Sequence, residues 1–274
     1  MPWSALKFEI HLTDNCNLNC AHCLHFSSLC ETAVFLDIVQ YENDIKRLSC
    51  LASGKAANIR ILGGEPLLHS SVIKFIEITR KYFPITDINN GIGVIELVTN
   101  GILLQKQTEQ FWEICKTNNI GIVISDYPIK INKEYINDQS KKYGIKLTMN
   151  SETRQNKSDG SYQQWVKVPI DLEGKQNIKK SFGLCFIGGG CFQLVDGKIY
   201  KCARIAYIKY FNKKFNKNLI VCEEDYIDIY KVNNIDEILD ALTEPALFCR
   251  YCKPEKTTWK NEWRKTTGEI SEWI

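Results

Sequence analysis

Residues Lys7–Cys23 read KFEIHLTDNCNLNCAHC, and this stretch contains the strongest signals in the chain. Its first part, Lys7–Leu12, is a short segment of the length expected for a strand. The loop that follows carries three cysteines in C-x3-C-x2-C spacing, at Cys16, Cys20 and Cys23. Thiolates are ligands of both iron–sulfur clusters and zinc. The stretch therefore predicts a strand that leads directly into a metal-binding loop.

The chain up to residue 150 continues as an alternation of strand-like runs and helical periods. Helical spacing of apolar residues separates the strands, and a more polar helix is expected over Lys133–Tyr143. This β-α alternation predicts a parallel sheet with right-handed crossovers. A sixth strand, Trp165–Ile170, is expected after the polar connector Ser151–Gly160. The five preceding strands are predicted at Lys7–Leu12, Asn58–Leu62, Val94–Thr99, Gly121–Ser125 and Ile145–Met149.

The loops after the first four strands are the places to look for chemistry, because in parallel α/β folds the active site gathers at the carboxyl ends of the strands. The first loop holds the three cysteines, and the second reads Gly63-Gly64-Glu65-Pro66. The third begins at Thr99-Asn100-Gly101 and the fourth at Ser125-Asp126. An active site is therefore expected at this edge of the sheet.

The cysteine spacing by itself leaves two kinds of metal site open. Three thiolates bind three corners of a four-iron cluster and leave one iron free to react. Structural zinc prefers four closed ligands, and His22 or His25 would supply the fourth. The spacing favours the cluster over zinc.

Composition limits the class of protein. The chain has 274 residues, a formal net charge of +3 and 12 cysteines. Neither a signal peptide nor an apolar run of ~18 residues is visible, so we expect a cytoplasmic protein with no membrane partner. A reducing compartment makes metal or catalytic roles more fitting for the cysteines than disulfides. The charge distribution does not favour nucleic-acid binding. Cys50 and Cys115 are expected to be buried in helices.

The cysteine loop and its neighbours resemble the radical S-adenosylmethionine (SAM) superfamily, whose hallmark is C-x3-C-x2-C after the first strand. The resemblance implies a partial (β/α)6 barrel of parallel strands and a [4Fe–4S] cluster on Cys16, Cys20 and Cys23. It also implies that SAM binds at the other loops, with His22 near adenine in a position that is more often aromatic. The expected cofactor-binding residues are His22, Gly63, Gly64, Glu65, Pro66, Thr99, Asn100 and Ser125.

The last third carries a second group of cysteines around a predicted hairpin. Gln193–Val195 and Lys198–Tyr200 alternate as strands, and Asp196-Gly197 is a tight-turn signal. Cys191 and Cys202 lie just outside the two ends of this hairpin, and a C-x2-C pair follows at Cys249 and Cys252. Geometry allows either zinc or a second [4Fe–4S] cluster here.

Radical SAM proteins with SPASM or twitch extensions have a similar cysteine pattern. That resemblance implies an auxiliary [4Fe–4S] cluster on Cys185, Cys202, Cys249 and Cys252, with Cys191 as a competing ligand for Cys185. It favours the single-cluster twitch type in a small C-terminal α+β extension. The chain is thereby divided into a radical SAM partial barrel over residues 1–165 and an auxiliary-cluster region over residues 166–274.

The resemblance implies an oxidoreductase or epimerase that cleaves SAM to a 5′-deoxyadenosyl radical and takes a hydrogen atom from a small, carbohydrate-like substrate. Cys222 and Cys191 are candidate hydrogen donors to the substrate radical, although burial alone also explains them. A flavodoxin- or ferredoxin-type reductant is the expected partner. Two alternatives stay open: modification of a ribosomally made peptide, and a non-catalytic zinc or iron–sulfur binding module.

Overall fold

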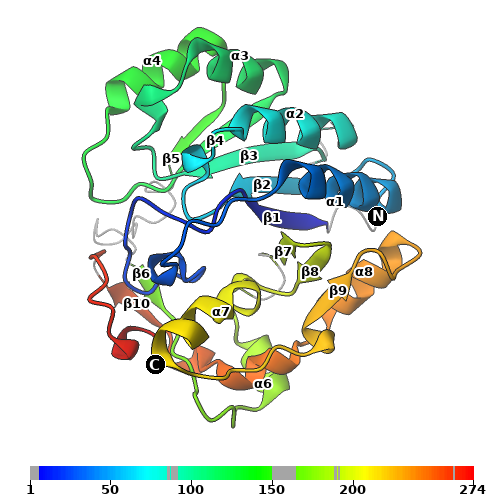
Figure 1. Cartoon of the computed structure of the whole chain (residues 1–274), viewed down its shortest axis with the longest axis vertical. Coiled ribbons are helices and arrows are strands. Elements are labelled where there is room, and N and C mark those ends of the chain that lie inside the picture. The colour runs from blue at the N-terminus through cyan, green and yellow to red at the C-terminus, as the bar shows by residue number, and fades with distance from the viewer. Residues whose placement is uncertain are drawn as a thin grey trace.

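The computed structural model describes residues 6–84, 87, 92–149, 165–187, 190, 192–261 and 263–274. Its first half is the predicted β-α alternation. Figure 1 shows the parallel strands running side by side with the connecting helices on their outer face. The strands are β1 (Lys7–His11), β2 (Asn58–Leu62), β3 (Val94–Thr99), β4 (Ile120–Ile124) and β5 (Leu147–Met149). The helices are α1 (Ile38–Leu51), α2 (Val72–Tyr82), α3 (Glu109–Thr117) and α4 (Lys133–Tyr143).

Local chemistry explains where these helices begin and end. The Asp37 carboxylate caps α1 by accepting from the backbone N–H groups of Val39 and Gln40, both at 2.9 Å. The Asn132 side chain caps the start of α4, and Gly144 ends that helix in the left-handed conformation with φ of 67°. The polar helix expected over Lys133–Tyr143 is thus confirmed with the same bounds.

The sheet has eight strands in the order β5-β4-β3-β2-β1-β7-β8-β9, and it is open rather than closed. The predicted hairpin is confirmed as β7 (Phe192–Val195) and β8 (Lys198–Tyr200), followed by β9 (Tyr226–Asp228). Asp196 and Gly197 both have positive φ, of 48° and 70°, as the tight turn requires. β7 lies parallel to β1, which makes it the sixth strand of the parallel set.

The sixth strand expected at Trp165–Ile170 does not join this sheet, so that expectation was wrong. Its residues form β6 (Trp165–Lys167), which pairs antiparallel with β10 (Thr258–Asn261) in a separate two-stranded sheet. Apolar character indicated a strand but gave no information about its partner. The fold class is nevertheless confirmed, because a mostly parallel, open α/β sheet is the architecture of a partial barrel.

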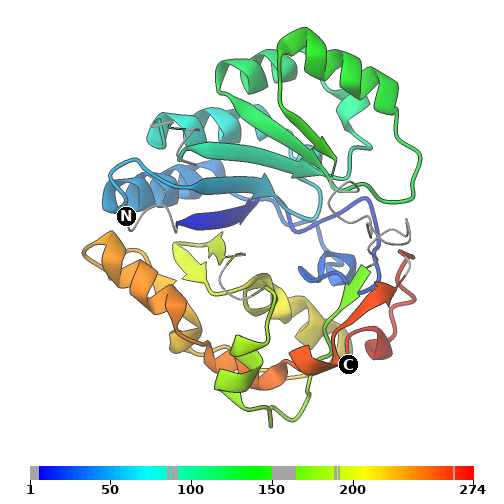
Figure 2. The ribbon, with the colours of Figure 1, turned by 180° about the vertical axis from the view of Figure 1, so that it is seen from behind.

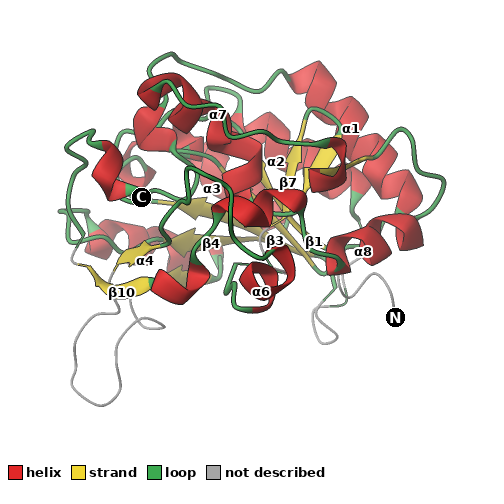
Figure 3. Cartoon of the chain, turned by 90° about the horizontal axis from the view of Figure 1, so that it is seen from below, coloured by secondary structure: helices red, strands yellow, loops and turns green. Residues whose placement is uncertain are grey.

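Two apolar cores stabilise the molecule. The larger one lies between the outer face of the sheet and the helices α1–α4, and it includes residues of α8 (Ile235–Thr243). The smaller one is built around α7 (Ala203–Phe215) and takes in Phe26 and Trp273, from opposite ends of the chain. Figure 3 shows helices on the periphery and strands toward the middle. Cys115 is buried in the larger core as expected, whereas Cys50 is exposed on α1, which corrects that prediction.

The remaining helical pieces complete the C-terminal half. α6 (Ile178–Gly183) packs against the short helix η7 (Leu247–Tyr251), and both lie in the part of the molecule farthest from α4 (Figure 2). Other short helices are η2 (Ser27–Leu29), η3 (Pro66–Leu68), η5 (Leu104–Lys106), η6 (Glu223–Asp225), η8 (Pro254–Lys256) and η9 (Ile270–Glu272). Within the described residues, no helix is long and apolar enough to cross a membrane.

Candidate active site

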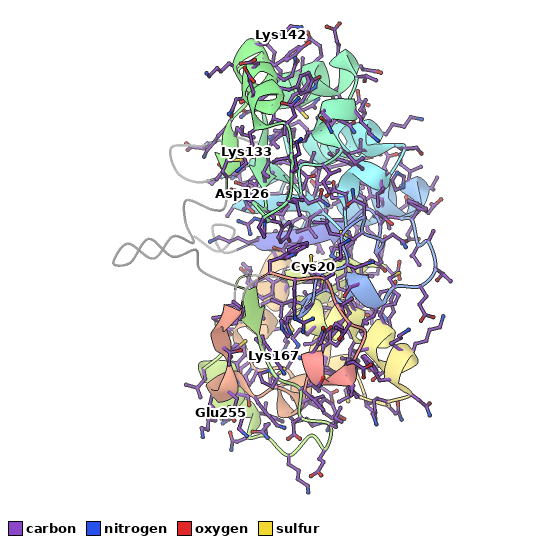
Figure 4. The ribbon with its side chains drawn as sticks, turned by 90° about the vertical axis from the view of Figure 1, so that its left-hand side faces the viewer. Cys20, Asp126, Lys133, Lys142, Lys167 and Glu255 are labelled. Atoms are coloured by element: carbon purple, nitrogen blue, oxygen red, sulfur yellow. The ribbon has the colours of Figure 1, made fainter. Side chains whose placement is uncertain are left out.

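The loops that follow β1 to β4 converge on one pocket of about 110 Å³. All three cysteines of the first loop line it. The residues that line it from the other loops are Gly63, Gly64, Thr99, Asn100, Ser125 and Tyr127. Figure 4 places Cys20 midway along the molecule, between Asp126 and Lys133 of the parallel half and Lys167 of the C-terminal half. The structure therefore gathers four loops that the sequence had placed at the same edge.

Gly63 and Gly64 are required by the close passage of two backbone segments. The Gly64 N–H donates to the Thr13 carbonyl at 2.8 Å, and the Glu65 N–H donates to the Asn15 carbonyl at 2.8 Å. A Cβ atom at Gly63 would lie 2.4 Å from the Thr13 oxygen, and one at Gly64 would lie 2.2 Å from the Asn15 oxygen. No side chain fits there. The glycines thus hold the second loop against the backbone that leads into the cysteines.

The Glu65 side chain ties the second loop to the third. Its buried carboxyl group accepts from the Thr99 hydroxyl at 2.7 Å, the Asn100 N–H at 2.9 Å and the Leu67 N–H at 3.2 Å. Burial raises the pKa of Glu65 to about 7, against the lowering effect of these hydrogen bonds. Glu65 acts here as a positioning residue, and Pro66 begins the short helix η3 beside it.

Hydrogen bonds to the thiols come both from within the cysteine loop and from far along the chain. The Trp263 indole N–H donates to the Cys20 sulfur at 3.1 Å, and the Leu18 N–H donates to the Cys16 sulfur at 3.3 Å. Burial raises the pKa of Cys16 and of Cys20 to about 12, and it also raises the pKa of Cys23. Metal ions supply the positive charge that deprotonates such thiols.

The donor set fits an iron–sulfur cluster better than one zinc ion. In the part of the chain that the structure describes, no three His, Cys, Asp or Glu side chains converge closely enough to hold a single metal ion. A cluster is larger than one ion and holds its thiolates farther apart. Three cysteines lining one pocket, with room beside them, suit three corners of a cluster with one corner open.

His22 and His25 occupy different environments. His22 has a left-handed backbone with φ of 58°, and its Nδ1 lies 2.6 Å from the Glu272 carbonyl in the C-terminal segment. It is absent from the described residues that line the cysteine pocket and lies beside Lys167 instead. His25, which the sequence suggested only as a zinc ligand, lines the cysteine pocket. Tyr127 was missed, since nothing in its local sequence signals the site.

The second group of cysteines also comes together. Cys202 directly precedes α7, Cys249 and Cys252 lie in and directly after η7, and Cys185 follows α6. Cys202 interacts electrostatically with the other three thiols, so all four lie near one another. The Arg204 guanidinium donates to the Cys252 sulfur at 3.6 Å.

Cys191 lies outside the described residues. Cys222 precedes η6, where its N–H donates to the Asp225 carboxylate at 2.8 Å. Cys222 is absent from the described residues that line the cysteine pocket.

Comparison with known proteins defines the class. Residues 10–136 match the family profile of the radical SAM superfamily. This region contains the cysteine loop, the glycine loop and the Thr99 and Ser125 loops described above. The chain thus contains a radical SAM domain, and that family implies SAM and a [4Fe–4S] cluster.

Proteins of known activity match part of the chain. The chain is 33% identical over 98 residues to a GTP 3′,8-cyclase of Thermodesulfovibrio yellowstonii, a match covering 36% of this chain and 28% of the cyclase. It is 34% identical over 105 residues to the GTP 3′,8-cyclase of Chlorobaculum tepidum, covering 38% of this chain and 28% of that protein. The chain therefore matches less than a third of the length of either cyclase.

Two solved structures share the fold over most of the chain. BtrN, crystallised in complex with AdoMet and 2-DOIA, has a TM-score of 0.52 and 17% identity, covering 98% of this chain and 97% of BtrN. Native anSMEcpe with bound AdoMet has a TM-score of 0.50 and 15% identity, covering 90% of this chain and 82% of that chain. At these identities the likeness extends to the fold and no further.

Proposed function

We propose that this protein is a radical SAM enzyme that abstracts a hydrogen atom from a small, carbohydrate-like substrate and thereby oxidises or epimerises it. Cys16, Cys20 and Cys23 would hold the reactive [4Fe–4S] cluster. SAM would bind beside it against the Gly63–Pro66 loop, Thr99–Asn100 and Ser125. The observation that carries the proposal is the single pocket onto which the three thiols and the carboxyl ends of β1 to β4 all open.

When bound, the reduced cluster and SAM supply a 5′-deoxyadenosyl radical, the species that abstracts the hydrogen atom. The residues of the chain position and shield these groups. Gly63 and Gly64 fix the second loop against the cysteine loop, and Glu65 fixes the third loop against the second. Trp263 donates its indole N–H to the Cys20 sulfur, and its ring centroid lies 6.0 Å from that of Tyr127, which lines the pocket. Both aromatic rings help to exclude water.

The proposal includes a second [4Fe–4S] cluster on Cys185, Cys202, Cys249 and Cys252, with Cys191 as the competing ligand for Cys185. The mutual proximity of the four described thiols supports it. Such a cluster would accept an electron from the substrate radical, which completes an oxidation. An epimerisation would instead need a hydrogen atom from a thiol, for which Cys222 and Cys191 are the candidates. A cytoplasmic flavodoxin or ferredoxin would supply the first electron.

A small-molecule substrate is supported by the relatives. BtrN shares the fold over nearly the whole of both chains, and its crystals contain 2-DOIA beside AdoMet. The cyclases, which match 36% and 38% of the chain, are named for GTP. Neither likeness transfers a particular substrate. Together they favour a small molecule over a ribosomally made peptide.

Iron and sulfide content after anaerobic reconstitution tests the proposal. The wild-type chain should hold about eight irons, and the Cys16→Ala/Cys20→Ala/Cys23→Ala variant about four. Dithionite-driven cleavage of SAM to 5′-deoxyadenosine should vanish in that variant. Cys50→Ala is the matched control, because Cys50 is exposed on α1, away from both groups, and should change neither value.

The same measurement separates the parts of the proposal. About four irons in wild type and none in the triple variant would withdraw the auxiliary cluster and the redox step that depends on it. A colourless protein that contains only zinc and leaves SAM intact would instead establish a non-catalytic metal-binding module.

A further inference from the structure

Arg204 is a buried cation in the first turn of α7, beside the second group of cysteines. Only 2% of its surface is exposed. An arginine side chain is always charged in a protein, and a buried charge is costly unless an opposite charge compensates it. Arginine is accordingly almost never fully buried without a partner. The groups that face its guanidinium therefore indicate what this part of the molecule is built to hold.

The partner of Arg204 is a cysteine sulfur. The guanidinium group donates to the Cys252 sulfur at 3.6 Å, and it forms no ion pair with a carboxylate of the described residues. Glu272 lines the same small cavity as Arg204, but its carboxylate accepts from Arg264. A neutral thiol is a weak acceptor and carries no compensating charge. The contact is therefore strong only when Cys252 is a thiolate, the form in which cysteine binds a metal.

The backbone around Cys252 is anchored on several sides, so its sulfur is presented to Arg204 in a defined place. The Cys252 N–H donates to the Cys249 carbonyl at 3.1 Å, and the Cys252 carbonyl accepts from the Ser181 hydroxyl at 3.1 Å. Cys252 also pairs with Ile170 in an isolated β-bridge. Arg204 is held in turn by α7. The contact therefore joins two anchored segments of the chain.

The start of α7 adds a second positive feature at the same group of thiols. This helix has 13 residues and begins directly after Cys202. The Cys202 sulfur accepts a hydrogen bond from the Ile205 N–H, in the first turn, where the helix dipole is positive. Arg204 and the N-terminus of α7 thus direct positive charge at Cys252 and at Cys202, respectively. This environment suits a group that carries negative charge.

We propose that Arg204 raises the reduction potential of the auxiliary cluster through its contact with the Cys252 sulfur. Reduction adds negative charge to a cluster that thiolates already make negative, and a nearby cation or a hydrogen bond to a ligand sulfur stabilises that form. This inference rests on the auxiliary cluster of the proposed function. It assigns Arg204 as a positioning residue that acts through Cys252 and makes the cluster a better acceptor for the electron of the substrate radical.

An EPR-monitored redox titration of the auxiliary cluster tests the inference. Arg204 also lines a small cavity with Cys23, so the titration uses the full chain with Cys16→Ala/Cys20→Ala/Cys23→Ala, in which only the auxiliary cluster is expected. Adding Arg204→Gln keeps an N–H donor and removes the charge. It should lower the ratio of reduced to oxidised cluster at a fixed potential roughly tenfold, a shift of ~59 mV for one electron. Arg204→Lys keeps the charge and should recover most of the shift.

Arg80→Gln in the same triple variant is the matched control. Arg80 is a partly buried arginine on α2, and its guanidinium donates to the Asn118 carbonyl at 2.8 Å. Its replacement removes the same charge in the parallel half of the molecule, away from the auxiliary cysteines. The potential of the auxiliary cluster should therefore stay unchanged.

Four results would overturn the inference. An equal potential with and without Arg204→Gln would do so and leave the proposed function intact. An equal shift in Arg80→Gln would attribute the effect to net charge alone. Loss of iron from both Arg204→Gln and Arg204→Lys would assign Arg204 to packing. No iron in the parent triple variant would withdraw the auxiliary cluster itself, and this inference with it.

Discussion

Single residues in the glycine loop set the geometry of the pocket. Gly63 and Gly64 lie so close to the backbone of Thr13 and Asn15 that a Cβ atom would overlap it. Glu65, directly after them, places a buried carboxyl group under the third loop. These residues therefore pack the loops against one another, in addition to any part they take in binding SAM. Two predictions at this scale separate the two roles.

Replacing Gly64 with alanine should push the second loop away from the cysteines. The added Cβ would meet backbone atoms of Asn15 and Cys16 at under 3 Å, and backbone has little room to move. We expect a loss of ~1–3 kcal/mol in the free energy of unfolding and a large drop in SAM cleavage. Gly121→Ala is the control, because a Cβ on that strand meets only ordinary contacts from 3.6 Å outward. Equal stability of the two variants, from denaturant unfolding, would contradict the packing role.

Glu65 should give the unreconstituted chain a specific pH dependence. Burial raises its pKa in the folded state to about 7 from an ordinary 4.5, so the folded state binds the proton more tightly than the unfolded state. Stability from this group is therefore fully present below pH 4.5, falls as the pH rises to about 7, and is constant above it. The difference in free energy of unfolding between wild type and Glu65→Gln, measured across this range, should change with that slope. A flat difference would show that the carboxyl is ionised throughout.

At the scale of elements, the C-terminal segment forms hydrogen bonds with the cysteine loop and holds it in place. The Ala21 N–H donates to the Arg264 carbonyl at 3.0 Å, and the Thr266 N–H donates to the Asn19 carbonyl at 2.8 Å. The buried Glu272 carboxylate fastens the segment by accepting from Arg264, Thr266 and Thr267. The last residues of the chain therefore help to shape a loop that begins at residue 16.

Replacing Trp263 with phenylalanine should lower the reduction potential of the N-terminal cluster. The indole N–H donates to the Cys20 sulfur at 3.1 Å, and hydrogen bonds to cluster sulfurs favour the more negative, reduced state. An EPR-monitored redox titration measures the shift. Trp112→Phe is the control: the Trp112 N–H has no partner among the described residues and lies on α3. In the unreconstituted chain, Cys20 should also react more slowly with iodoacetamide in Trp263→Phe, because the indole N–H lowers the pKa of the Cys20 thiol and its loss leaves less thiolate. An unchanged potential in Trp263→Phe would rule out this role.

At the scale of the whole molecule, one sheet contains strands from both halves of the chain. β7, β8 and β9 extend it beyond β1, and the buried side chains of Glu9 and Gln193 hydrogen-bond across the junction at 2.6 Å. α8 adds Ile235 and Ile238 to the larger core. We still propose residue 165 as the boundary between the part of the chain that binds the SAM-cleaving cluster and the part that binds the auxiliary cluster. The packing gives no reason to expect two separate folding units.

Cutting the chain at that point should therefore unfold it. A fragment of residues 1–165 would expose the β1 edge and the core surface that α8 covers, and exposed strand edges promote aggregation. We expect this fragment to aggregate or to lack a cooperative thermal transition, whereas the full chain should unfold in one transition by circular dichroism. A soluble fragment that melts cooperatively would establish residues 1–165 as an independent domain.

The sequence by itself determined what depends on short-range periodicity and spacing. β2, β3 and α4 have the predicted bounds, and the hairpin after Cys191 forms as its Asp196-Gly197 turn requires. The order of polar loops along the chain placed the pocket, because parallel strands bring their carboxyl ends to one edge. These features are local, or follow from topology once the strands are known.

The tertiary structure alone decided which distant segments meet. Apolar spacing did not distinguish the buried Cys115 from the exposed Cys50, since each lies on a helix whose rotation is set by packing. It predicted a strand over Trp165–Ile170 without its partner, and it did not place β7 against β1. The contacts of Trp263 with Cys20, and of Tyr207 with His11, join residues about 240 and about 200 positions apart. Such pairings depend on the energetics of the whole core, which no local pattern in the sequence records.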